Sequence, residues 1–237
     1  MSEGLRVESL HAYYGAAHIL FDVRLAAPVG TCVALLGRNG AGKSTLLKAI
    51  TRAGVRAEGH ATFDGRDLLR MPTFEIARLG VELVPEDRRV YRNFSVRENL
   101  GLAEAAATRD RPAIGLDRIL STFPTLEPLL GRRGNQLSGG EQQLVAIARA
   151  MVANPRLLLM DEPSAGLSPV VLETVGDAIR RLRAGHDLTM VLAEQNARFA
   201  VDLADHVVVI DEGRIVFTGT REAFEAEAEV QARYLSV

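Results

Sequence analysis

The amino-acid sequence predicts an α/β protein with a mostly parallel core sheet, an N-terminal antiparallel β subdomain and an inserted helical subdomain. Two observations predict this fold class. Short apolar strands alternate with helical patterns in the first and last parts of the chain, which is typical of parallel sheets. Between these parts, from about residue 87 to residue 152, the strand pattern gives way to helical spacing interrupted by prolines and a glycine.

The first part of the chain is expected to hold five strands and one helix. The helix, 43–53, has Leu46, Leu47 and Ile50 on one face and follows a glycine-rich turn. Asp64-Gly65 is expected to form a turn after the fourth strand. The five strands are expected at 5–10, 19–25, 31–36, 60–63 and 81–84.

The remaining elements follow the same reasoning. A hairpin with its turn at Glu212-Gly213 is expected to lead into a charged C-terminal helix. The other helices are expected at 96–107, 117–123, 140–152 and 170–184, and the other strands at 157–160, 189–193 and 207–210. The chain, 1–237, is therefore expected to form one domain, with a core of residues 1–86 and 153–237 and a helical subdomain of residues 87–152.

Bulk composition narrows the possible functions. The chain has 237 residues, 47% of them apolar, and a formal net charge of −2, so it lacks the basic character expected of a nucleic-acid-binding protein. Its longest apolar stretches are strand-sized and its first residues lack an apolar signal core, which favours a cytoplasmic protein. The single cysteine, Cys32, is expected to be a buried thiol. The histidines show no metal-ligand spacing; they are His11, His18, His60, His186 and His206.

The glycine-rich turn after the third strand has the spacing of a phosphate-binding loop. Residues 37–44, Gly-Arg-Asn-Gly-Ala-Gly-Lys-Ser, match the pattern G-x-x-x-x-G-K-[ST] in full. Glycines let successive amide groups point at phosphate oxygens, and the positive end of the following helix adds to the attraction. Lys43 would contact the β- and γ-phosphates, and the Ser44 hydroxyl would bind Mg²⁺. The phosphate-binding residues are expected to be Gly37, Asn39, Gly40, Ala41, Gly42, Lys43, Ser44 and Thr45.

An ordinary strand-to-helix turn is the weaker interpretation of these residues, and the motif alone indicates only a nucleoside triphosphate. Two acids make the indication more specific. Asp161 and Glu162 end an apolar strand, at the sheet edge where α/β proteins bind ligands. Asp161 would hold Mg²⁺ directly or through water, and Glu162 would activate the attacking water as general base. A solvent-exposed acidic turn would explain the pair in a protein without the phosphate-binding loop.

A second candidate anion site opens the helix expected at 140–152. Ser138, Gly139 and Gly140 offer a hydroxyl and glycine amides at a helix N-terminus, followed by Glu141 in the first turn. Serine capping alone explains these residues well as an ordinary helix start. Their position between the phosphate-binding loop and the Asp-Glu pair favours a functional role.

With these three motifs the chain resembles the ATPase subunits of ABC (ATP-binding cassette) transporters over essentially its whole length. The resemblance implies a P-loop NTPase fold of ABC type that binds ATP with Mg²⁺ between two subunits in head-to-tail arrangement. It implies that Lys43, Ser44 and Asp161 act from one subunit. Ser138 and Gly140, with Gly139 and Glu141 beside them, would act from the other. Tyr14 would stack on adenine, although Tyr13 alternates with it along the strand and could be the nearer ring.

Three positions depart from the common pattern of the family. Glu86 stands where most members have a glutamine, and its carboxylate could still meet Mg²⁺ or its water. Ser168 replaces an aspartate. Gln195 stands where a histidine is expected; it can donate a hydrogen bond to the γ-phosphate but cannot carry a proton. These departures, with the segments 84–90, 194–197 and 232–235, resemble the LivF-type ATPase of branched-chain amino-acid uptake systems.

That resemblance implies a particular assembly. Two ATPase subunits, either two copies or this chain with a LivG-like partner, would pair beneath two membrane permease subunits fed by an external substrate-binding protein. The chain would lie peripherally on the inner face of the cell membrane, and the helical region after Glu86 would dock the permease. Urea and short amides are cargoes of similar systems.

Two other function classes are less favoured. A soluble ABC ATPase of translation or DNA repair usually carries two cassettes or a long coiled coil in one chain. A small-molecule kinase or GTPase has no use for the Ser138-Gly139-Gly140 segment.

Overall fold

The computed structural model describes residues 4–184 and 188–234, so His186 and Leu235 lie outside the described residues. Its core is a six-stranded sheet in the order β10-β9-β3-β8-β7-β6, and neighbouring strands from β9 to β6 pair in parallel while β10 is antiparallel. The mostly parallel core sheet predicted from the sequence is thus confirmed. The strands are β3 (Cys32–Leu36), β6 (Val81–Val84), β7 (Leu157–Asp161), β8 (Thr189–Glu194), β9 (His206–Asp211) and β10 (Arg214–Thr220).

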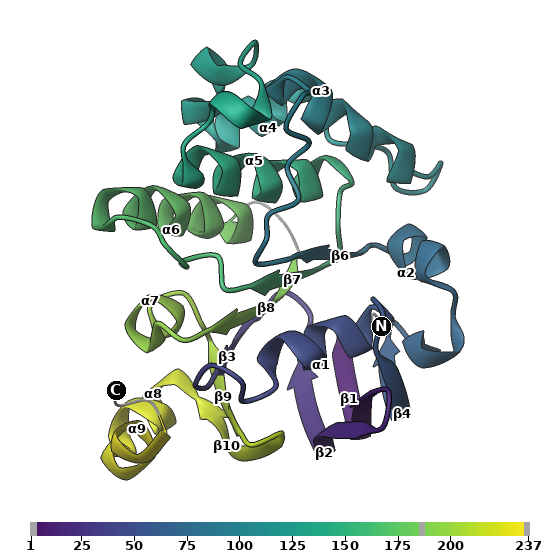
Figure 1. Cartoon of the computed structure of the whole chain (residues 1–237), viewed down its shortest axis with the longest axis vertical. Helices are drawn as coiled ribbons and strands as arrows, with labels where there is room; N and C mark the ends of the chain where they lie inside the picture. The colour runs from purple at the N-terminus through teal and green to yellow at the C-terminus, as the bar shows by residue number, and fades with distance from the viewer. Residues whose placement is uncertain (1–3, 185–187, 235–237) are drawn as a thin grey trace.

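A second, four-stranded sheet has the order β2-β1-β4-β5 and is antiparallel, as the sequence predicts for the N-terminal part. Helix α1 (Lys43–Ile50) contacts strands of both sheets, and Figure 1 shows it lying between them. The strands of this sheet are β1 (Leu5–Tyr14), β2 (Ala17–Ala27), β4 (Arg56–Phe63) and β5 (Arg66–Asp67).

The helices form two groups. Figure 1 shows α3 (Val96–Gly101), α4 (Leu116–Thr122) and α5 (Gly139–Val152) gathered at one end of the molecule, with α6 (Pro169–Ala184) between them and the core sheet. The second group belongs to the C-terminal part of the chain and lies away from the first: α7 (Ala197–Val201), α8 (Arg221–Ala226) and α9 (Ala228–Tyr234). Helix α2 (Thr73–Leu79) precedes β6. Among the described residues, no helix combines the length and the apolar character needed to cross a membrane.

The core sheet is buried on both faces, which explains why its strands are continuous apolar runs. Val33 and Leu35 of β3 pack into the cluster that contains α1, whereas Cys32, Ala34 and Leu36 pack into the cluster that contains α5 and α6. Alternate residues of a strand point to opposite faces, so one strand serves both cores. Burial raises the pKa of Cys32 to about 12, which confirms the expected buried thiol.

Several element boundaries differ from those expected. Strand β4 begins at Arg56 because Arg56 to Glu58 pair with β1, although this stretch lacks an apolar run. The helix expected at 96–107 ends at Gly101 and continues as a 3₁₀ turn, Leu102–Ala106. The C-terminal helix is two short helices that meet at Glu227. Helices α2 and α7 are too short to carry a clear helical period, and neither was expected.

Candidate active site

The turn after β3 has the backbone that a phosphate-binding loop requires. Gly40 and Gly42 have φ angles of 81° and 112°, in the left-handed region that glycine adopts without steric cost. Gly42 caps the N-terminus of α1, and a Cβ built there would lie 2.6 Å from Leu20 Cδ2 of β2. The Ala41 carbonyl accepts a hydrogen bond from Gly213 N–H at 2.9 Å. The loop therefore packs against β2 and is hydrogen-bonded to the β9–β10 turn.

Lys43 is held inside this loop. Its side chain is 3% exposed, and its ammonium donates to the Gly37 carbonyl at 2.8 Å and to the Arg38 carbonyl at 3.2 Å. The same nitrogen lies 3.0 Å from Glu162 Oε1. A lysine ammonium has three donors, so each can face an oxygen here. The hydrogen-bonded, buried ammonium lies at the base of the loop, where it could attract the oxygens of a bound phosphate.

Ser44 and Asp161 meet across the sheet edge. Ser44 Oγ donates to Asp161 Oδ1 at 2.9 Å, and Asp161 is 3% exposed. Burial raises the pKa of Asp161; the Ser44 hydrogen bond and Lys48 oppose this effect, and the charges of Glu162 and Glu86 add to it. A hydroxyl and carboxylates are the oxygen donors that Mg²⁺ prefers, and a divalent cation would relieve the repulsion between these acids. The residues at this edge therefore fit a magnesium ion.

The loop lines one open cleft of about 320 Å³ together with Glu86 and Glu162, whereas Asp161 does not line it. Most of the residues expected from the phosphate-binding motif contribute, together with two of the expected acids. Among the described residues, Tyr14, Gln195 and the segment 138–141 do not line it. The lining residues are Asn39, Gly40, Gly42, Lys43, Ser44, Thr45, Glu86 and Glu162.

Glu162 has a backbone conformation that is rare for a residue with a side chain. Its φ angle is 47°, in the left-handed region. Its N–H donates to the Ala193 carbonyl of β8 at 2.8 Å, which anchors the turn where β7 ends. Strained residues of this kind concentrate at functional sites, and here the turn brings the carboxylate to Lys43.

Sequence reasoning missed Glu194, the last residue of β8. It is 1% exposed and accepts hydrogen bonds from Ser164 N–H at 2.8 Å, Ser164 Oγ at 2.7 Å and Asn196 N–H at 3.3 Å. Burial raises its pKa, and these three hydrogen bonds act in the opposite direction. Glu194 thus joins the loop after Glu162 to the end of β8. An acid that ends an otherwise apolar strand was the available signal. Gln195, the next residue, is exposed.

Ser138 is the N-cap of α5. Ser138 Oγ accepts from Glu141 N–H at 3.3 Å, and Ser138 N–H donates to Glu141 Oε2 at 2.7 Å. The capping interpretation is therefore correct, and the cap itself engages the N–H groups of Ser138 and Glu141. Gly140 packs so closely against α6 that a Cβ there would lie 2.2 Å from Val171 Cγ1.

The two neighbouring tyrosines differ in environment. The Tyr13 ring stacks on His18, with centroids 4.4 Å apart, and the Arg56 guanidinium lies 4.2 Å from its centre. Tyr14 is 44% exposed. Tyr14 is therefore the more exposed of the two residues, whereas Tyr13 is half-buried.

The family model described as "ABC transporter" matches residues 20–165, more than half of the chain. The chain belongs to the ABC transporter family. As a member it is an ATP-binding and ATP-hydrolysing subunit that works with a second cassette and with membrane subunits. The P-loop fold of ABC type, predicted from the three motifs, is confirmed.

Individual relatives are similar over nearly the whole cassette. The chain is 38% identical to the high-affinity branched-chain amino acid transport ATP-binding protein BraG of Pseudomonas aeruginosa, covering 98% of this chain and 99% of BraG. It is 36% identical to the probable branched-chain amino acid transport ATP-binding protein LivF of Archaeoglobus fulgidus, covering 91% and 92%. The predicted LivF-type resemblance is thus confirmed.

A solved structure agrees with the fold. The ADP conformation of MJ1267, an ATP-binding cassette of an ABC transporter, superposes on this cassette with a TM-score of 0.80 at 27% identity. The match covers 96% of this chain and 94% of that chain.

Proposed function

We propose that this cassette hydrolyses ATP to power the import of branched-chain amino acids through separate membrane subunits. One observation supports the composite-site mechanism. The chain has a cleft around Lys43 and a helix N-terminus at Ser138 that could bind an anion, yet Ser138 is not among the described residues that line the cleft. Two such chains in head-to-tail arrangement would let each Ser138 segment cap the nucleotide held by the other chain. The names of the two relatives at 36–38% identity support the cargo.

The loop residues would bind the triphosphate as their geometry suggests. Amides from Gly37 to Thr45 would surround the phosphates, and Lys43 would supply the positive charge. Mg²⁺, when bound, would neutralise phosphate charge, held by Ser44 and Asp161 with Glu86 nearby. Tyr14 would stack on adenine through its exposed ring.

Glu162 would orient and deprotonate the attacking water. Its carboxylate lies beside Lys43 in the cleft that would receive the γ-phosphate and the attacking water. Gln195 would donate a hydrogen bond to the γ-phosphate when the two cassettes close, because its side chain is exposed at the end of β8. Ser138, Gly139, Gly140 and Glu141 of the partner would complete the site.

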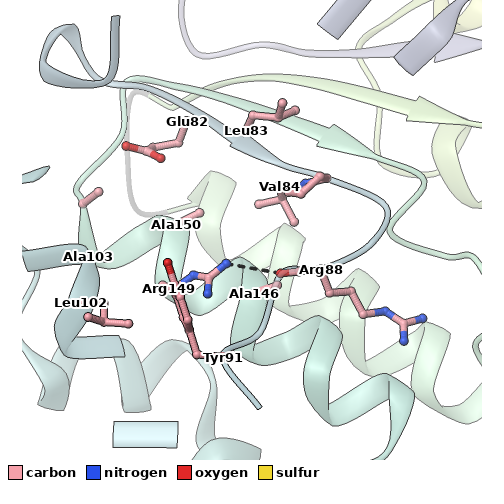
Figure 2. Close-up of a pocket in the computed structure, with 12 residues that line it drawn as sticks. Glu82, Leu83, Val84, Arg88, Tyr91, Leu102, Ala103, Ala146, Arg149 and Ala150 are labelled. Atoms are coloured by element: carbon pink, nitrogen blue, oxygen red, sulfur yellow. Dashed lines mark hydrogen bonds between the residues drawn. The ribbon is translucent and has the colours of Figure 1, made fainter. Parts of the chain in front are cut away.

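A groove between the core sheet and the helical subdomain would dock the membrane subunit. It has a volume of about 240 Å³ and is formed by β6, the turn after it, the 3₁₀ turn and α5. Figure 2 shows Glu82, Tyr91 and Arg149 around this groove, with small alanines of α5 on its floor. The mixture of apolar surface with the ionisable side chains of Glu82, Arg88 and Arg149 suits a short helix with one or two polar anchors.

Purification from the native membrane through a tag on this chain tests the proposal. The expected complex contains two permeases and a second cassette, either a copy of this chain or a LivG-like subunit. In proteoliposomes loaded with MgATP, and with the external binding protein added, we expect uptake of labelled leucine that is lost in Glu162→Gln. Uptake of urea or a short amide without leucine would contradict the cargo. A tagged chain that purifies without any membrane protein would contradict a transport function.

A further inference from the structure

The turn that follows Glu86 has an unusual backbone. Arg88 and Arg89 have φ angles of 59° and 47°, a conformation that residues with side chains rarely adopt even singly. Arg88 N–H donates to the Pro85 carbonyl at 2.9 Å, which closes the turn. A backbone of this kind persists only where surrounding contacts fix it. The contacts of the two arginines therefore indicate which parts of the molecule this turn connects.

Arg149 of α5 holds the turn from the groove side. Its Nη1 donates to the Arg89 carbonyl at 2.7 Å, and its Nη2 donates to the Arg88 carbonyl at 3.3 Å. Its guanidinium also lies 5.5 Å from the centre of the Tyr91 ring. Figure 2 shows Arg149 beside Tyr91, with its bond to the Arg88 backbone drawn as a dashed line. A segment docked in the groove against Tyr91 and Arg149 would therefore touch the side chain that holds this backbone.

The Arg88 side chain runs away from Tyr91 and Arg149, as Figure 2 shows. Its Nε donates to Gln143 Oε1 at 3.1 Å, and its Nη2 donates to the Ala165 carbonyl at 3.0 Å. Gln143 lies on α5, the helix that Ser138 caps, and Ala165 lies in the loop that follows Glu162. One guanidinium thus joins the two segments that carry the opposite halves of the composite site.

The environment of Arg88 makes these contacts specific. Gln143 is 2% exposed, and its amide nitrogen has no hydrogen-bond partner within the described part of the chain, so Arg88 fixes the side chain through its oxygen. A Cβ built at Gly139 would lie 3.1 Å from Arg88 Nη1, so the guanidinium also packs against the start of α5. A planar guanidinium can donate to two acceptors in fixed directions, which an ammonium cannot reproduce.

We propose that Arg88 is a positioning residue for ATP hydrolysis. It holds the Ser138 end of α5 and the loop after Glu162 in a fixed position relative to each other. Because Arg149 anchors the backbone of Arg88 at the groove, a shift of that turn would move both of these segments. The inference rests on the proposed function, because it requires that the Ser138 segment and Glu162 serve composite ATP sites and that the groove docks a membrane subunit.

The test compares Arg88→Ala with Arg89→Ala in the complex purified through a tag on this chain. Arg89 is a matched control, because it is adjacent and shares the unusual backbone. Within the described residues, the partner of its exposed side chain is its near neighbour Asp87, at 3.2 Å. For Arg88→Ala we expect kcat to fall at least ~10-fold while the Kd of the full chain for MgATP stays within about twofold, because the Lys43 loop is intact. Arg89→Ala should stay within about twofold of wild type in both quantities. Arg88→Lys should recover only part of kcat, because lysine lacks the second directed donor.

A folding defect could also lower kcat, so a second variant separates the two effects. Arg88→Met combined with Gln143→Leu removes both partners of the buried hydrogen bond and leaves no polar group of that pair unpaired. We expect its Tm to lie near that of wild type while kcat stays low. If kcat returned together with Tm, Arg88 would serve only to satisfy Gln143, and the proposal would be overturned.

Two further outcomes distinguish this inference from the proposed function. Equal kcat values for Arg88→Ala and Arg89→Ala, in a complex whose wild-type form hydrolyses ATP and whose Glu162→Gln form does not, would overturn the role of Arg88 alone. Normal turnover by Glu162→Gln would overturn the proposed mechanism itself.

Discussion

Lys43 Nζ lies 3.0 Å from Glu162 Oε1, so the lysine of the phosphate-binding loop and the proposed general base form an ion pair. The two side chains are only 3% and 15% exposed, so the pair lies largely away from solvent. In the proposed mechanism the γ-phosphate competes with Glu162 for the same ammonium. Binding of the nucleotide would therefore supply Lys43 with a new anion and release the carboxylate to orient water.

Replacing Glu162 separates binding from hydrolysis. Glu162→Gln should retain MgATP, because the neutral amide competes less for Lys43, while hydrolysis falls by at least ~10²-fold, or about 2.7 kcal/mol in the barrier. Equilibrium binding of MgATP and single-turnover phosphate release measure the two effects. Glu173→Gln, at an exposed position on α6, is the control and should behave as wild type. Normal turnover by Glu162→Gln would exclude Glu162 as the base.

Ser138 has both a structural and a proposed catalytic role, and a second serine allows them to be separated. Ser95 caps α3 through the same arrangement with Glu98 that Ser138 makes with Glu141 at α5. Ser138→Ala and Ser95→Ala should each lose about 1 kcal/mol of stability from the missing cap. Only Ser138→Ala should reduce ATPase activity.

The composite site adds a stricter form of this test. In a dimer with Ser138→Ala on one subunit, hydrolysis should fail at the nucleotide held by the other subunit's Lys43 loop. Site-specific turnover in mixed dimers, with one loop inactivated in turn, measures this. Activity that follows the mutated subunit's own loop would contradict the head-to-tail arrangement.

The clustering of Lys43, Ser44, Asp161 and Glu162 was predictable because it needs only local motifs and one rule of topology. Strands β3 and β7 both neighbour β8 in parallel, so their carboxyl ends open at the same sheet edge. The glycine spacing of the loop is likewise a local backbone requirement. Such features can therefore be predicted from the sequence alone.

The remaining features depend on contacts between segments that are distant in the sequence. Glu194 meets Ser164 and Arg88 meets Ala165 only after the sheet and α5 are assembled. Strand β4 extends to Arg56 because β1 lies beside it, although its residues 56–60 have no apolar pattern. Short capped elements such as α7, which Asn196 starts by accepting from Phe199 N–H, are too brief for periodicity to detect. Tertiary pairing, rather than propensity, decides these parts.

Gln195 tests how this cassette senses the γ-phosphate without a histidine. Gln195→Ala should reduce kcat about 10-fold, the loss expected from one hydrogen bond made in the transition state, whereas Gln195→His should retain a donor and be tolerated. Steady-state ATPase assays of both variants at several pH values make the comparison. A loss of equal size in Ala and His variants would indicate that Gln195 packs against its neighbours instead of contacting the nucleotide.

The environment of Glu82 in the docking groove should make the free energy of unfolding depend on pH. Burial raises the pKa of this β6 carboxyl to about 7, against the opposing charges of Arg111 and Arg149. The folded protein therefore keeps a proton that the unfolded chain has already released. Stability is lost as the pH rises from the ordinary value of 4.5 through about 7.

Glu82→Gln cannot ionise, so it should remove this loss. Between pH 5 and pH 8 the free energy of unfolding should fall by about 2–3 kcal/mol more in the wild type than in Glu82→Gln. Urea denaturation at the two pH values measures the difference. Glu75→Gln, at an exposed position on α2, is the control and should alter it by less than ~0.5 kcal/mol. Parallel pH curves for wild type and Glu82→Gln would show that the groove does not hold Glu82 in its protonated form.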